Sequence, residues 1–182
     1  MKSITNLAMT PAAHPVIADD LVEYHAARLL LLFRVCGKND RIEGLTKLAK
    51  LDFFVRYPEF FEQVCRHLGL AASASIKTRE SGMVRFHYGP WDKRYYQVLA
   101  YLEGRELVTV SKEGSAFVFS LTPKGAQLAD QLRKASPFGE LVAQMKAVKK
   151  VLGAKSGSTI KSLIYKVFDR EVGAKALGEP IS

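Results

Sequence analysis

The sequence has few cysteines and no long apolar run. Its two cysteines, Cys36 and Cys65, form no CxxC pair, which argues against a disulfide framework or a cysteine-rich zinc site. The longest apolar run, residues 29–33, lies between Arg28 and Arg34 and is far shorter than the roughly 20 residues that cross a bilayer. The N-terminal residues also lack the apolar segment of a secretory signal. We therefore expect no membrane association and a cytoplasmic location.

Patterns that carry catalysis are missing as well. The four histidines have no metal-ligand spacing, and the nearest Cys-His pair, Cys65 and His67, lies on different faces of a predicted helix. The loop at 153–158 does not match the GxxxxGK[ST] spacing of a phosphate-binding loop, and no strand precedes it, so we interpret it as the capped start of a helix. We expect no enzymatic activity, no metal, no cofactor and no small-molecule substrate.

What the sequence has is positive charge. There are 27 basic and 18 acidic residues, a net charge of +9, and a basic surface attracts polyanions. Residues 135–182 contain eight basic and four acidic residues, so nearly half of the excess falls in the last quarter of the chain. Nucleic acid and an acidic protein surface both fit this charge, and a basic composition is also common among soluble proteins.

Helical periods of apolar residues alternate with shorter β-prone runs. The periods predict helices at 17–35, 42–55, 58–68, 93–104, 123–132, 140–152 and 158–168. Alternating residues predict strands at 83–88, 107–110 and 116–121, the last two joined by a five-residue loop that contains Gly114. Residues 71–78 are predicted to form a loop, and Gly89-Pro90 a break after the first strand.

The order of helix, hairpin and helix between Trp91 and Asp130 is typical of a winged helix-turn-helix. Thr122 can cap the last of these helices, and Pro123 suits its first turn. We predict a mainly α-helical protein with a small β-hairpin wing, an α+β fold of the winged-helix type with additional N- and C-terminal helices. Its parts are expected to be an N-terminal arm at 1–16, the winged-helix domain at 17–134 and a basic helical extension at 135–182.

Two uses of this domain fit the residues, and both stay open. A recognition helix offers polar and basic side chains to base edges, and basic residues elsewhere contact phosphates. The candidate DNA-binding residues are Lys93, Arg94, Gln97, Arg105, Lys112, Lys149, Lys150 and Lys155. The same helix is rich in tyrosine, which suits a protein interface equally well, as does an apolar face on the helix at 140–152. The candidate partner-binding residues are Trp91, Tyr95, Tyr96, Tyr101, Leu141, Met145 and Val148.

Several motifs together resemble a known family. They are Gly44 to Pro58 (GLTKLAKLDFFVRYP), Tyr88 to Asp92 (YGPWD), the wing exit Leu121 to Gly125 (LTPKG) and Ser156 to Tyr165 (SGSTIKSLIY). The chain resembles the small middle components of bacterial three-component ABC-ATPase defence systems, the group that includes the accessory C subunit of Lamassu-type anti-phage systems. The resemblance implies a non-catalytic subunit that binds an SMC-like ABC ATPase and an effector nuclease, with double-stranded DNA as a further possible partner.

A stand-alone transcriptional regulator is the competing hypothesis. In such a protein a winged-helix dimer reads operator DNA, and dimerisation needs a long exposed apolar helix face. The helix at 140–152 offers one, with Leu141, Met145, Val148 and Leu152. That face could equally dock on a larger partner.

Overall fold

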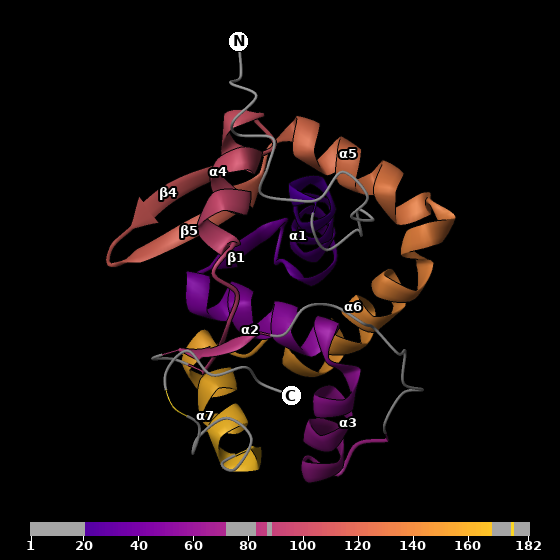
Figure 1. Ribbon diagram of the computed structural model, residues 1–182, viewed down its shortest axis with the longest axis vertical. Helices are drawn as coiled ribbons and strands as arrows, with labels where there is room; N and C mark the ends of the chain where they lie inside the picture. The colour runs from indigo at the N-terminus through magenta and orange to yellow at the C-terminus, as the bar shows by residue number, and fades with distance from the viewer. Residues whose placement is uncertain (1–20, 72–82, 87–88, 169–175, 177–182) are drawn as a thin grey trace, which may run out of the picture.

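The computed structural model of the protein describes residues 21–71, 83–86, 89–168 and 176. Within them the chain is mainly helical and has a small three-stranded antiparallel sheet, in agreement with the predicted α+β class (Figure 1). The helices are α1 (Val22–Cys36), α2 (Leu45–Arg56), α3 (Pro58–His67), α4 (Tyr95–Gly104), α5 (Pro123–Lys134), η3 (Ser136–Phe138), α6 (Gly139–Leu152) and α7 (Gly157–Val167). The strands are β1 (Arg41–Glu43), β2 (Val84–Phe86), β3 (Gly89–Trp91), β4 (Val108–Glu113) and β5 (Ala116–Leu121). All seven predicted α-helices are present, whereas the predicted arm at 1–16 lies outside the described residues.

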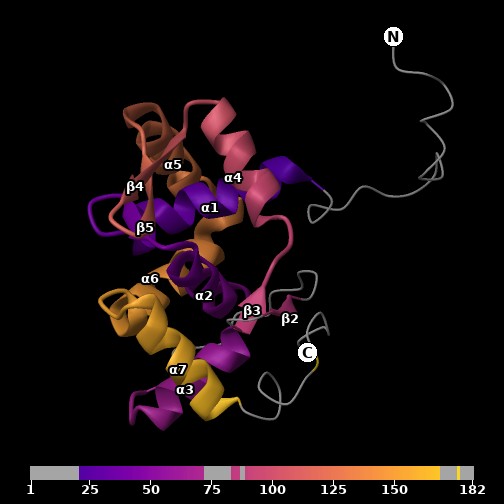
Figure 2. The same cartoon turned by 90° about the vertical axis from the view of Figure 1, so that its left-hand side faces the viewer.

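Helix α1 is the centre of the fold. Its five-residue apolar run, 29–33, is at most 2% exposed, because α2, α4, α5 and α6 pack around the helix on different sides (Figures 1 and 2). A helix that is apolar on all sides is stable only when it is surrounded in this way. The run that is too short to cross a membrane is thus the middle of a core helix, and no helix in the described part of the chain has the length and apolar character of a membrane span.

The three-stranded sheet has the order β1-β5-β4, with both pairs antiparallel. Residues 42 and 43 were expected to begin the helix at 42–55. This prediction was wrong, because both belong to strand β1. Gly44 explains the difference, since its φ of +80° breaks the helix before Leu45 and lets its backbone N–H bond to the carbonyl of Phe117 at 2.8 Å. Ile42 consequently pairs with Phe119 in the sheet.

Strands β4 and β5 form a hairpin that projects beside α4 (Figure 1). The pairing continues to Glu113 opposite Ala116, so the connection is a two-residue turn with Gly114 at a φ of +61°. The predicted five-residue loop was therefore too long. The predicted break at Gly89-Pro90 was also wrong, because both residues belong to β3, which pairs with β2.

The exit from the hairpin is built as the sequence predicts. Thr122 is the N-cap of α5, and its hydroxyl accepts a hydrogen bond from the backbone N–H of Gly125 at 2.9 Å. The same hydroxyl donates to the carbonyl of Glu106 at 2.7 Å, which fastens the helix to the start of the hairpin. At Gly125 a Cβ would lie 2.0 Å from the carbonyl oxygen of Leu107, so only glycine fits there.

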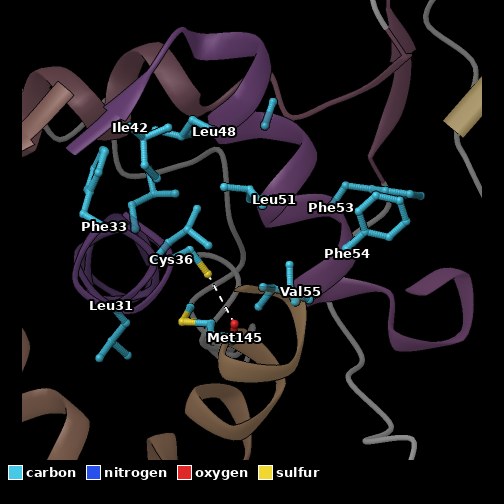
Figure 3. Packing of buried hydrophobic residues seen from close by; sticks show 14 of the residues in the cluster. Leu31, Phe33, Cys36, Ile42, Leu48, Leu51, Phe53, Phe54, Val55 and Met145 are labelled. Atoms are coloured by element: carbon cyan, nitrogen blue, oxygen red, sulfur yellow. Dashed lines mark hydrogen bonds between the residues drawn. The ribbon is translucent and has the colours of Figure 1, made fainter. Parts of the chain in front are cut away.

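The two C-terminal helices belong to the main core. Helix α6 packs on α1 and α2, and α7 packs on α2 and α3. Figure 3 shows Met145 of α6 facing Cys36 and Val55, and the thiol of Cys36 donates to the Met145 carbonyl at 3.4 Å. Helices α6 and α7 of the predicted C-terminal extension thus contribute buried side chains to the same core as the preceding helices.

Candidate functional site

Helix α4 presents only part of the predicted contact surface. Tyr95 is 2% exposed and packs in the core, whereas Tyr96 is 66% exposed. Lys93 and Gln97 are also exposed, so these three side chains form the accessible beginning of α4. The first turn of α4 and the residues just before it can therefore offer one aromatic ring, one amide and one ammonium group to a partner.

Arg94 is held against the protein. Its Nη2 donates to Asp92 Oδ2 at 2.7 Å, its backbone N–H donates to Asp92 Oδ1 at 2.9 Å, and its Nη1 lies 2.8 Å from His25 Nε2. Burial alone would raise the pKa of Asp92, but the hydrogen bonds from Arg94 and the charge of Arg56 outweigh burial and hold that pKa well below its usual range. Arg94 thus fixes the turn before α4, and its guanidinium is occupied by these contacts.

A buried polar network continues from this turn into the core. Arg28 Nε donates to Asp52 Oδ1 at 2.9 Å, and the hydroxyl of Tyr95 donates to Asp52 Oδ2 at 2.8 Å. Arg56 Nη1 donates to Asp92 Oδ2 at 2.7 Å. Burial and the nearby Asp52 charge raise the pKa of Tyr95 well above its usual value, so its hydroxyl remains a donor. The network joins α1 and α2 to the start of α4 and sets the position of that helix.

Lys50 makes a second buried polar link. Its side chain is fully buried, and its Nζ donates to the carbonyl of Pro90 at 2.8 Å, which connects α2 to β3. Burial lowers the pKa of Lys50 to about 7, with a smaller contribution from the charge of Lys161. The side-chain nitrogen of Lys50 is thus not available to a ligand at the surface.

Five of the predicted partner-binding residues are core residues. Leu141, Met145 and Val148 of α6 are at most 8% exposed, because they face α1 and α2. Trp91 and Tyr95 are similarly buried and lie in edge-to-face contact, with ring centroids 5.3 Å apart. The prediction that these five residues contact a partner is therefore wrong. Of the predicted partner-binding residues, only Tyr96 and Tyr101 have accessible side chains.

Tyr101 lies at the far end of α4 from Lys93 and is half-buried. Its ring centroid is 4.5 Å from the guanidinium carbon of Arg105, and its hydroxyl donates to Glu23 at 3.4 Å. Arg105 is exposed, and so is Lys112, which lies further along in β4. Arg105 and Lys112, the residues predicted to contact phosphates, are therefore accessible, but one precedes the hairpin and the other lies within it.

Positive charge is concentrated away from α4 and the hairpin. Residues 92–121 contain four basic and four acidic residues, so this unit has no net charge. Residues 133–166 contain eight basic residues and one acidic residue, a net charge of +7. A polyanion is attracted by the second group far more than by the first.

The densest part of this charge surrounds a shallow hollow between α1, α5 and α6. Its lining residues are Arg34, Val35, Arg133, Lys146, Lys149 and Lys150, and we call this surface the basic face. Arg34 is paired with Asp40 and Asp130, at 2.8 and 2.9 Å. The three lysines are exposed and make no ion pair with any described residue. Two of the predicted DNA-binding residues, Lys149 and Lys150, lie here, whereas Lys155 is half-buried beyond the end of α6.

The sequence contains a signal for the polar network, although it does not reveal the partners. Arg28, Lys50, Asp52 and Arg56 occur within helical periods in which nearly every neighbour is apolar. Charged side chains at such positions are buried, and buried charges need partners on other elements. Which carboxylate pairs with which arginine depends on how α1, α2 and α4 cross, and no spacing along the chain reveals that.

The described residues include no group of three or more His, Cys, Asp or Glu side chains that could hold a metal ion. Comparison with known protein families, with curated proteins and with solved structures finds no match to this chain.

Proposed function

We propose that this protein is a winged-helix accessory subunit without catalytic activity, which binds an SMC-like ABC ATPase and an effector nuclease in an anti-phage defence complex in the cytoplasm. In this proposal α4 and the hairpin contact protein, and the basic face contacts the DNA backbone. The observation that carries the proposal is the distribution of charge, because the unit that would read DNA in a winged helix is neutral overall and the opposite side of α1 is strongly basic.

The order of elements supports the winged-helix assignment. Helices α1, α2 and α4 would be the three helices of the domain, and β4 and β5 the wing. Strand β1 follows the first helix and pairs with the second wing strand, giving the order β1-β5-β4. Helix α3 and the β2-β3 hairpin would then be an insertion between the second helix and the recognition helix.

The start of α4 is poorly suited to reading bases. The early residues of a recognition helix must reach into the major groove. Here Tyr95 is buried and Arg94 is engaged by Asp92 and His25, which leaves Lys93 and Gln97 on either side of the exposed ring of Tyr96. A single exposed aromatic ring with few charges around it is characteristic of a protein contact.

The basic face supports a contact that is independent of DNA sequence. Lys146, Lys149 and Lys150 carry their charges on one exposed side of α6, next to Arg133. Flexible lysines bind phosphates as point charges and do not select bases. Such a surface holds DNA while another subunit acts on it.

The burial of α6 weighs against the regulator hypothesis. A dimer of that kind needs the apolar face of the helix at 140–152 to be exposed, but Met145, Val148 and Leu152 of that helix are fully buried in the chain's own core. The identity of the partners rests on the family resemblance, and the geometry supports only the accessory role.

Fluorescence anisotropy on random-sequence duplex DNA, across a salt series, tests where DNA binds. Lys149→Glu with Lys150→Glu is expected to weaken binding and to reduce the salt slope of log K by roughly 2, at about 0.9 for each phosphate that the protein no longer neutralises. The matched control, Lys93→Glu with Lys112→Glu, changes the same amount of charge on α4 and the wing and is expected to have a much smaller effect. A larger effect from the control pair, or sequence-specific binding by a dimer, would contradict the proposal and favour the regulator.

A further inference from the structure

A groove of about 580 Å³ runs between α3 and α6. Its floor is apolar and its rim is basic. The lining residues are Phe61, Cys65, Leu70, Ala71, Ala143, Lys146, Ala147, Lys150 and Val151. We call this surface the α3–α6 groove.

The side chains of the groove leave room for an apolar occupant. Ala143, Ala147 and Val151 follow one another at four-residue spacing along α6, so small side chains line one wall for two turns. Leu70 at the end of the opposite wall is 45% exposed, so the apolar lining of the groove reaches the surface. An open channel of this shape, between two helices, suits the apolar stripe of a third helix.

The charge of the rim specifies the occupant further. Lys146 and Lys150 lie one turn apart on α6 and are both exposed. The lining contains no acidic residue, and neither lysine has an ion-pair partner among the described residues. A helix seated in the groove would place its flanking residues against these two ammonium groups, and carboxylates there would supply the missing charge.

We propose that the α3–α6 groove docks an acidic amphipathic helix of a partner subunit. The inference rests on the proposed function, because it identifies the surface on which a partner subunit binds and the chemistry of that contact. The occupant carries large apolar residues at i, i+3 or i+4, and i+7, and its carboxylates lie on the edge next to Lys146 and Lys150. DNA is excluded from the groove itself because the floor has no donors for phosphate, although the same two lysines also border the basic face.

The first test uses a synthetic probe and the full chain. A fluorescent 18-residue peptide with leucines on one helical face and glutamates along one edge is titrated with the protein. We expect saturable binding that Ala143→Trp and the pair Lys146→Glu with Lys150→Glu each weaken at least tenfold. Ala143 is exposed, so the tryptophan obstructs the groove without entering the core. The pair Lys134→Glu with Lys149→Glu makes the same charge change outside the groove and is expected to leave affinity within about twofold.

Three outcomes overturn the inference. They are no saturable binding, equal reductions in affinity from the two charge pairs, and binding that appears only when residues 72–82 are replaced by a glycine-serine linker. The last would assign the groove to the chain's own segment. Thermal unfolding by circular dichroism shows whether each variant is folded, and either the tryptophan variant or the lysine pair is sufficient if the other fails to fold.

A second test separates this inference from the proposed function. The wild-type chain and the same variants are mixed with the purified ATPase and nuclease subunits, and complex formation is measured by size-exclusion chromatography. A complex that forms with wild type and is abolished in the groove variants supports both proposals. A complex that forms equally well with all variants overturns the groove assignment only. Failure of wild type to form any complex overturns the proposed function. In that case the peptide titration still shows whether the groove binds an acidic amphipathic helix.

Discussion

The buried lysine on α2 gives the protein a predictable dependence of stability on pH. Lys50 is fully buried, and its pKa is lowered from 10.5 to about 7. Between these two values the unfolded chain binds a proton at Lys50 that the folded chain has released. The free energy of unfolding therefore rises with pH in this range, and the destabilising effect of the charged lysine is fully present only below pH 7.

The size of the effect follows from the two pKa values. At about 1.36 kcal/mol per pH unit, the difference between the two pKa values corresponds to roughly 5 kcal/mol of stability. Between pH 7.0 and 8.5 the free energy of unfolding rises by about 1.5 to 2 kcal/mol of this total. Lys50→Met keeps a side chain of similar volume and removes the titrating group. The variant leaves the Pro90 carbonyl without its donor, which costs about 1 to 3 kcal/mol at every pH and does not affect the slope.

Urea denaturation followed by circular dichroism at pH 7.0 and 8.5 measures this difference. We expect wild type to gain roughly 1.5 to 2 kcal/mol relative to Lys50→Met between the two pH values. The exposed Lys149→Met is the control and should retain the wild-type dependence. The thiol of Cys36, whose pKa burial raises to about 12, stays protonated between pH 7.0 and 8.5 in all three folded proteins, so its contribution cancels from the comparison. Identical pH dependence in wild type and Lys50→Met would mean that water reaches Lys50 and that its pKa is ordinary.

Two further pairs of substitutions test how α4 and the β4-β5 hairpin are held in place. Tyr95→Phe removes the hydroxyl that donates to Asp52 and should lower the free energy of unfolding by about 1 to 3 kcal/mol, whereas Tyr96→Phe at the exposed neighbour should change it by less than about 0.5 kcal/mol. Equal effects of the two would contradict the polar network described around Asp52. Gly125→Ala places a Cβ 2.0 Å from the Leu107 carbonyl oxygen and should cost at least about 2 kcal/mol, measured by thermal unfolding. Gly104→Ala meets no atom within 4 Å and should be neutral or stabilising, so a similar destabilisation in both glycine variants would argue against the close approach of α5 to the hairpin.

The elements of this fold were largely predictable because their signals are local. Thr122 and Pro123 mark the start of α5 through capping chemistry that involves only neighbouring residues, and the alternation at 116–121 marks a strand. Strand β1 was not predictable, since three residues are too few for a period and Ile42 also fits the helix that follows. Its identity depends on pairing with β5, which lies more than 70 residues further along the chain.

The site was less predictable than the fold because exposure is a tertiary property. Tyr95 and Tyr96 are adjacent and chemically identical, yet one is in the core and the other is on the surface. The apolar face of α6 looked available for a partner because the sequence does not reveal that α1 and α2 already cover it. The basic part of the chain could be predicted from the sequence, since a segment with many lysines and few acidic residues is basic in any arrangement of the helices.

Light scattering during size-exclusion chromatography, on the chain alone and on the chain co-expressed with an SMC-like ABC ATPase, shows whether the protein is an ATPase subunit. We expect a monomer close to the chain mass of 20.2 kDa when the protein is alone, and co-elution with the ATPase at fixed stoichiometry when the two are together. A stable dimer of the chain that ignores the ATPase and binds one palindromic DNA sequence at low-nanomolar concentration would contradict this expectation.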